Sequence, residues 1–175
     1  MPHRARYALL DRDGTILVEK NYLNSIEDME LLPGALDGLS LLNAKGFGLI
    51  VITNQSGIGR GLVTVEAVEA IHAELIRRLE AEGIPLSAVY YCPHLPSDHC
   101  DCRKPRAGLA ERAAADFGFN LSESLVIGDK ASDIAFGRAI KARSFLVRTG
   151  YGTEQESLAH ADLVVDNLKE AALRA

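Results

Sequence analysis

Apolar runs alternate with amphipathic segments along the chain, and this alternation predicts an α/β fold with a mainly parallel sheet. Short continuous apolar runs are typical of strands buried on both faces, and apolar residues three or four positions apart predict helices. The expected strands cover residues 7–10, 47–52, 88–91, 125–127 and 145–147, with 163–165 as a short edge strand. The expected helices cover residues 35–45, 65–82, 108–117 and 134–140, with one more at the C-terminus.

Helix boundaries are marked by single residues. Thr64 has the side chain of an N-cap and precedes a helix that runs to about Glu82. Gly46, Gly83 and Gly118 each follow a helical segment, where glycine commonly ends a helix.

Polar side chains follow three of the expected strands at the point where each strand ends. Asp11 and Asp13 follow the first strand, Thr53 and Asn54 the second, and Asp129 the fourth. Ligands of open parallel sheets bind beyond the carboxyl ends of the strands, so these residues are expected to form one site.

Composition limits the classes of protein that fit this pattern. The chain has 175 residues, of which 47% are hydrophobic, which suits a single domain over residues 1–175. No apolar run approaches the length of about 20 residues that a membrane span needs, and basic residues 1–6 lead directly into a strand rather than a secretory h-region. A net charge of −5 argues against nucleic-acid binding. We therefore expect a cytoplasmic monomer without a membrane or nucleic-acid partner.

The segment Asp11-Arg12-Asp13-Gly14-Thr15 places two carboxylates where the chain begins to turn. One carboxylate could bind a metal and act as a nucleophile, while the other transfers a proton. By itself the motif also fits an acidic turn. It does not fit an EF-hand, because the glycine is the fourth residue of the loop rather than the sixth.

A glycine-rich segment, residues 53–61, follows the second strand. Its hydroxyl, amide and backbone N–H groups could bind an anion, although ordinary turn chemistry explains it equally well in isolation. Its glycines match neither a dinucleotide-binding fingerprint nor a phosphate loop.

The three cysteines lie within 11 positions, Cys92, Cys100 and Cys102, and an odd number so closely spaced favours a metal site over disulfides. With His94 they complete a Cys₃His set for a structural Zn²⁺, since four protein ligands leave no open position. His99 is an alternative fourth ligand, but Cys-x-His and Cys-x-Cys make two matched arms.

Charged residues beside these motifs could complete the site. Arg103 and Lys104 directly follow the cysteine loop, and both can bind phosphate. Asp129 follows a buried strand and precedes a helix, as a Mg²⁺ ligand would, whereas Asp133 fits a supporting position in the first helical turn.

Taken together, the motifs resemble a known family. Asp11-x-Asp13-Gly14-Thr15, Thr53-Asn54, Lys104 and Gly128-Asp129 are similar to the four motifs of haloacid-dehalogenase (HAD) phosphatases. The longer strings 53–61, 92–94, 100–105 and 128–130 resemble the D-glycero-D-manno-heptose 1,7-bisphosphate 7-phosphatases, which act in nucleotide-activated heptose synthesis for lipopolysaccharide or surface glycans. The cysteine loop is also similar to that of histidinol-phosphate phosphatases, which remains an alternative. A non-catalytic zinc-loop interaction or phosphate-binding module is a further alternative, although the acids of an active enzyme are all present.

The resemblance implies a three-layer Rossmann-like HAD fold and a mechanism. Asp11 would attack phosphorus to form an aspartyl-phosphate, and Asp13 would act as acid and then base. Thr53 and Lys104 would hold the phosphoryl group. Mg²⁺ would be bound by Asp11, the Asp13 carbonyl and Asp129.

The chain leaves no room for a separate cap domain, so an open site is expected, with specificity set by three loops. The loops are residues 19–22, residues 56–60 and the cysteine loop. The expected contacts to a small phosphorylated sugar come from Glu19, Lys20, Asn21, Tyr22, Asn54, Gln55, Ser56, Arg60, Arg103 and Lys130.

Overall fold

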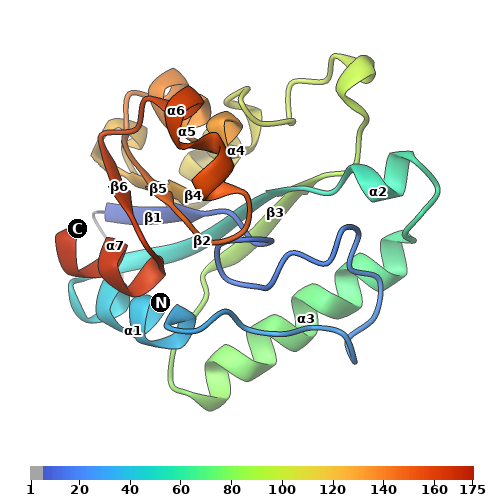
Figure 1. Ribbon diagram of the computed structural model, residues 1–175, viewed down its shortest axis with the longest axis horizontal. Coiled ribbons are helices and arrows are strands. Elements are labelled where there is room, and N and C mark those ends of the chain that lie inside the picture. Colours follow the sequence, from blue (N-terminus) through green and yellow to red (C-terminus); the bar gives the residue numbers. More distant parts are fainter. Residues whose placement is uncertain (1–5) are drawn as a thin grey trace.

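The computed structural model describes residues 6–175, which form one six-stranded parallel sheet in the order β3-β2-β1-β4-β5-β6 (Figure 1). The predicted fold class and every predicted strand are confirmed. The basic stretch at residues 1–5 lies outside the described residues. The strands are β1 (Arg6–Leu10), β2 (Phe47–Asn54), β3 (Ala88–Cys92), β4 (Leu125–Gly128), β5 (Arg143–Val147) and β6 (Leu163–Val165).

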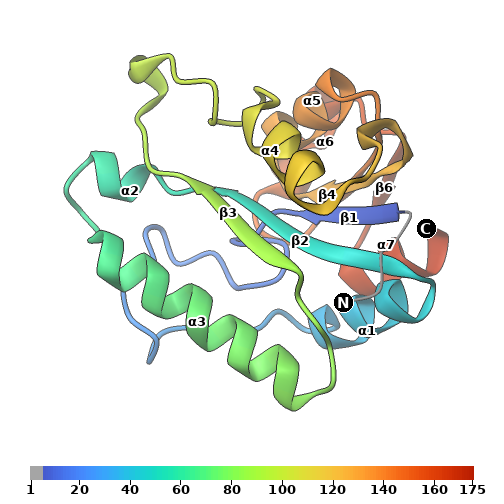
Figure 2. The ribbon, with the colours of Figure 1, turned by 180° about the vertical axis from the view of Figure 1, so that it is seen from behind.

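Helices cover both faces of the sheet, as Figures 1 and 2 show from opposite sides. One layer contains α1 (Ala35–Ala44), α3 (Val65–Ala81) and α7 (Leu168–Arg174). The other contains α4 (Gly108–Phe117), α5 (Ala131–Ala139) and α6 (Gly152–Ala159). The short helix α2 (Ser56–Gly59) lies beyond the end of β2, near the loop that follows β3. None of the described helices is long and apolar enough to cross a bilayer.

Alternate residues of the central strands pack against opposite helical layers. In β1, Ala8 and Leu10 join the core beneath α1, α3 and α7, while Tyr7 and Leu9 join the core beneath α4 and α5. Since both faces are covered, the strand has no polar alternation, which explains its continuous apolar sequence.

Local signals gave most helix boundaries correctly. The Thr64 hydroxyl accepts a hydrogen bond from the N–H of Ala67 at 3.1 Å, so it caps α3 as predicted. Gly118 ends α4 in the left-handed conformation, with φ of 67°. In contrast, α5 begins three residues earlier than predicted, because the Asp133 carboxylate accepts a hydrogen bond from the N–H of Lys130.

Two helices were not predicted. The sequence of α2 is Ser-Gly-Ile-Gly, which has low helix propensity. In α6 only Gly152 and Ala159 are buried, so no apolar stripe marks the helix. Both follow the carboxyl end of a strand and therefore lie near the predicted site.

Candidate active site

A cavity of about 370 Å³ opens at the carboxyl edge of the sheet, where the predicted polar clusters meet. Lys20 and Arg60 are not among its lining residues: Lys20 pairs with Glu30 at 3.0 Å, and Arg60 is exposed. Leu23, Ser132 and Tyr151 line the cavity without having been predicted, and Gly57 lines it from within the predicted loop 56–60. The predicted residues that line it are Asp11, Asp13, Glu19, Asn21, Tyr22, Thr53, Asn54, Gln55, Ser56, Arg103, Lys104 and Lys130.

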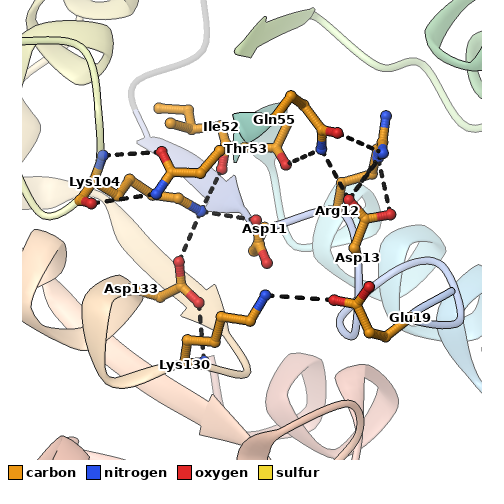
Figure 3. Close-up of polar contacts among 11 residues, drawn as sticks. Asp11, Arg12, Asp13, Glu19, Ile52, Thr53, Gln55, Lys104, Lys130 and Asp133 are labelled. Carbon is orange, nitrogen blue, oxygen red and sulfur yellow. Dashed lines mark hydrogen bonds and ion pairs between the residues drawn. The ribbon is translucent and has the colours of Figure 1, made fainter. Parts of the chain in front are cut away.

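Asp11 and Lys104 form a buried ion pair at the floor of this cavity. Lys104 Nζ lies 2.8 Å from Asp11 Oδ1, and both side chains are almost fully buried (Figure 3). Burial opposes ionisation of Asp11, but the charges of Lys104 and Lys130 outweigh it and lower the pKa of this carboxyl. Asp11 is therefore held as a carboxylate, the form that can act as a nucleophile.

Contacts from several elements fix the position of Lys104. Its ammonium also donates to the carbonyl of Ile52 at 2.6 Å and pairs with Asp133 at 2.7 Å. The side chain of Asn54 bonds both the N–H and the carbonyl of Lys104, at 3.0 and 3.2 Å. Asn54, predicted to contact substrate, thus also anchors the backbone of a phosphate-binding candidate.

Three carboxylates, those of Asp11, Asp129 and Asp133, approach within 4.8 Å of one another and form a group that could hold a cation. Burial and the charges of Asp11 and Asp133 raise the pKa of Asp129 to about 8. The Asp129 Oδ1 atom is buried without a hydrogen-bond partner, while Oδ2 accepts from the N–H of Tyr151 at 2.9 Å. A buried, unpartnered carboxylate oxygen fits a hard divalent cation such as Mg²⁺.

Two glycines close around Asp129. Gly14 and Gly150 both have positive φ, 84° and 57°, and a Cβ on either would collide with the Asp129 carboxylate. The glycine in the Asp-x-Asp-Gly segment is therefore required both by its backbone conformation and by the close approach of the acid.

Asp13 lies on the opposite side of Asp11 from Lys104 (Figure 3). It pairs with the fully buried guanidinium of Arg12 at 2.9 Å and accepts a hydrogen bond from Gln55 Nε2 at 2.9 Å. Gln55 Nε2 also donates to the hydroxyl of Thr53 at 2.9 Å. Gln55 was predicted to bind substrate, but its amide is already engaged with Asp13, Thr53 and Arg12.

The loop after β1 is tied to the opposite wall of the cavity. Glu19 accepts a hydrogen bond from the N–H of Asn21 at 2.9 Å and pairs with Lys130 at 3.4 Å. Asn21 and Tyr22 both have positive φ, 52° and 78°, which is rare for residues with side chains. Burial opposes the charged form of Lys130, but Asp11, Asp129 and Glu19 raise its pKa, so the cavity retains this cation.

The predicted cysteine–histidine cluster is assembled in the loop that follows β3. The ligand atoms of Cys92, His94, Cys100 and Cys102 lie within 4.8 Å of one another. The Sγ atoms are 3.2 to 3.6 Å apart, close to the separation of about 3.8 Å in a tetrahedral site with Zn–S bonds of about 2.3 Å. His94, rather than His99, is the histidine of the cluster.

This loop reaches the cavity through Arg103, whose guanidinium donates to the carbonyl of His94 at 3.4 Å. It also meets the glycine-rich segment, because the N–H of Gly59 donates to the carbonyl of Pro93 at 3.0 Å. A metal in the cluster would therefore stiffen one wall of the cavity.

Sequence patterns missed Arg12 and His72 as parts of the site. Arg12 lies between two acids, and nothing in the neighbouring sequence indicates that its side chain is buried. His72 did carry a signal, because it lies on the apolar stripe of α3 between Ile71 and Leu75. Ser132 lies in the first turn of α5, which begins earlier than predicted, and Tyr151 directly precedes α6, which was not predicted. The position of these two residues at the cavity was therefore not predicted either.

Comparisons with known proteins agree with this geometry. A family model described as HAD-hydrolase-like matches residues 101–171. The D-glycero-beta-D-manno-heptose-1,7-bisphosphate 7-phosphatase of Pseudomonas aeruginosa is 34% identical over 167 residues, covering 94% of both chains. The D-glycero-alpha-D-manno-heptose-1,7-bisphosphate 7-phosphatase of Photorhabdus laumondii is 37% identical, covering 87% of this chain and 88% of the relative.

A solved structure is similar over almost the entire chain. The crystal structure of the D,D-heptose 1,7-bisphosphate phosphatase from B. bronchiseptica, complexed with magnesium and phosphate, superimposes with a TM-score of 0.90. It is 29% identical in sequence, and the match covers 97% of both chains.

Proposed function

Because the chain belongs to the D-glycero-D-manno-heptose-1,7-bisphosphate 7-phosphatases, a group of HAD-type phosphoric monoester hydrolases, we propose that it removes the 7-phosphate of such a bisphosphate. The observation that carries this proposal is that Asp11 pairs with Lys104 at the floor of one cavity, where the Asp11 carboxylate also lies within 4.8 Å of those of Asp129 and Asp133. That arrangement combines a nucleophile, a phosphate-binding cation and a metal site.

In the first step, an Asp11 oxygen attacks phosphorus as the bond between phosphorus and the sugar oxygen breaks. Lys104 bonds Oδ1 of Asp11, so we assign the attack to Oδ2. Asp13 gives a proton to the leaving sugar oxygen, and Asp11 becomes an aspartyl-phosphate.

In the second step, Asp13 takes a proton from a water molecule whose oxygen attacks phosphorus. The acyl-phosphate bond breaks, inorganic phosphate leaves and the Asp11 carboxylate is regenerated. One residue thus acts as acid and then as base, as microscopic reversibility favours.

Asp11, the backbone carbonyl of Asp13, and Asp129 would hold Mg²⁺, consistent with the unpartnered oxygen of Asp129. When bound, the cation supplies positive charge that reduces repulsion between the Asp11 carboxylate and the phosphate dianion.

Thr53 and Lys104 would bind the transferred phosphoryl group, since phosphoryl transfer depends mainly on positioning and charge stabilisation. Arg103 and Lys130 are the cations on the cavity walls suited to the second phosphate or to sugar hydroxyls. Lys20 and Arg60, which lie outside the cavity lining, would reach substrate only by moving.

Zn²⁺ in the cluster of Cys92, His94, Cys100 and Cys102 would have a structural function. Metal binding in such a loop contributes folding free energy, and here it would hold Arg103 at the cavity wall.

The test is phosphate release in the presence of Mg²⁺ with three substrates: the α and β anomers of heptose 1,7-bisphosphate, and histidinol phosphate. We expect rapid release of phosphate from at least one heptose anomer, with retention of the 1-phosphate detected by ³¹P NMR. Faster release from histidinol phosphate than from either anomer would overturn it.

A further inference from the structure

We propose that Arg12, Gln55 and His72 are positioning residues that hold the Asp13 carboxyl for proton transfer through its Oδ1 atom. This inference rests on the acid–base function proposed for Asp13. It concerns side chains that come from the turn after β1, from the residue that follows β2 and from helix α3, and that meet at the cavity wall formed by Gln55.

Arg12 is the centre of this network. Its side chain is fully buried, and a buried guanidinium is costly unless its donors are paired. Nε donates to both oxygens of Asp13 at 3.2 and 3.1 Å, Nη2 donates to Gln55 Oε1 at 3.1 Å, and Nη1 bonds His72 Nε2 at 2.9 Å. Every nitrogen of the guanidinium therefore has a fixed partner, which fixes the plane of the group.

Gln55 is oriented by Arg12. Arginine has only donors, so the atom of Gln55 that faces Arg12 must be the carbonyl oxygen, Oε1. The amide nitrogen then points to Asp13 Oδ2 and to the Thr53 hydroxyl, both at 2.9 Å. Arg12 thus determines which end of Gln55 meets the acid–base residue.

The two carboxylate oxygens of Asp13 have different hydrogen-bond donors. Oδ2 faces three donors: Arg12 Nη2 at 2.9 Å, Arg12 Nε at 3.1 Å and Gln55 Nε2 at 2.9 Å. Oδ1 accepts a hydrogen bond from Arg12 Nε at the longer distance of 3.2 Å. Oδ1 is therefore the oxygen available to carry a proton, while Oδ2 anchors the carboxyl.

His72 completes the network as an acceptor. Because Arg12 can only donate, Nε2 of His72 must lack a proton, and the neutral ring carries its proton on Nδ1. Burial and the neighbouring Arg12 charge lower the pKa of His72 to about 3, consistent with a neutral ring. The ring also packs against Tyr91, with centroids 5.4 Å apart.

In chemical terms, the proton on Oδ1 passes to the leaving oxygen as its bond to phosphorus breaks, and Oδ1 later takes a proton from the attacking water. If the Asp13 carboxyl were no longer held in place, the first step would slow most for a poor leaving group, because its oxygen must be protonated before it departs. A general loss of folding or of phosphate binding would not distinguish between leaving groups.

The experiment compares kcat/KM for phenyl phosphate and 4-nitrophenyl phosphate, two aryl esters of similar shape whose leaving groups differ in basicity. Phenol, with a pKa of about 10, is the poorer leaving group. The variants are His72→Phe, which keeps a ring but no acceptor, and His72→Gln, which restores an acceptor. Gln55→Met provides a second break in the network if His72→Phe folds poorly, as judged by thermal unfolding.

We expect kcat/KM for phenyl phosphate to fall about tenfold or more in His72→Phe, with a change of less than about threefold for 4-nitrophenyl phosphate. His72→Gln should restore most of the loss. Gln55→Met also removes the donor to the Thr53 hydroxyl, so both esters should lose activity, with the larger loss for phenyl phosphate. Equal losses with both esters, or no loss with either, would overturn the positioning function.

Two further measurements distinguish failure of this inference from failure of the proposed function. If wild type hydrolyses the aryl esters but no heptose bisphosphate, the assigned substrate is wrong and the network is still tested. If Asp13→Asn lowers kcat/KM equally for both esters, Asp13 is not the acid, and the inference falls with it.

Discussion

Lys104 Nζ lies 2.7 Å from Asp133 Oδ1, and the two side chains are only 4% and 2% exposed. This pair joins the loop after the cysteine cluster to the start of α5, and it holds the same ammonium that contacts Asp11 (Figure 3). Asp133 is therefore a support for the phosphate-binding lysine as well as the residue that caps α5.

Replacing Asp133 with Ala should destabilise the protein by about 3–5 kcal/mol, because it leaves a buried cation short of one partner and removes a cap. The measurement is urea unfolding followed by circular dichroism. The matched control is Asp37→Ala, which breaks the exposed pair with Lys169 and should cost less than about 1 kcal/mol. Similar losses in the two variants would contradict this account.

Asp11→Asn should abolish turnover, with a loss of at least about 10³-fold in kcat, because the amide cannot form the aspartyl-phosphate. The fold should persist, since Asn Oδ1 can still accept from Lys104. Phosphate release and thermal unfolding together check this prediction. Substantial activity in a folded variant would rule out Asp11 as the nucleophile.

Gly14→Ala should reduce Mg²⁺ affinity as well as stability, because the added Cβ would displace the Asp129 carboxylate. Gly46→Ala is the matched control: its φ is 89°, close to the 84° of Gly14, but no atom lies within 4 Å of the added Cβ. The control should cost about 1 kcal/mol from backbone strain alone. Mg²⁺ titration of activity and calorimetry separate the two effects.

His94→Ala should lower the zinc content of the purified protein and raise KM for the heptose substrate, because Arg103 loses its fixed position. His99→Ala should retain the metal, since His99 is not part of the cluster. Metal analysis by mass spectrometry and steady-state kinetics provide the comparison. Loss of zinc in His99→Ala with retention in His94→Ala would reverse the ligand assignment.

The buried, neutral His72 should make stability fall as pH is lowered. Its pKa is about 3 in the folded protein and near 6.5 in the unfolded chain, so the unfolded state binds the additional proton between these values. The contribution is almost complete at pH 7.5 and decreases by about 1.4 kcal/mol between pH 7.5 and 5.5. His72→Gln cannot titrate, so its free energy of unfolding should depend less on pH by that amount. Parallel pH profiles for the two proteins would contradict the neutral state of His72.

The positions of the strands and the polar groups at their carboxyl ends could be predicted from patterns within short segments. Parallel strands buried on both faces are apolar throughout, so continuous apolar runs such as residues 47–52 predict them. Parallel strands also end at one edge of the sheet, so their sequence positions alone group Asp11, Thr53, Asn54 and Asp129. The metal-binding pattern of Cys92, His94, Cys100 and Cys102 was likewise local, because its four residues lie in one loop.

Relationships between distant segments were decided only by tertiary structure. Arg12 and His72 are 60 positions apart, and no pattern near either residue indicates that helix α3 brings a histidine to the guanidinium. The partners of Lys104 are residues 11, 52 and 133, and they depend on how the end of β1, strand β2 and the start of α5 pack around the loop that carries Lys104. Sequence determined which chemical groups reach that edge, since strand ends are set by local apolar pattern. Packing decided which oxygen of each acid is bonded and which remains free to react, because that depends on contacts between elements far apart in the chain.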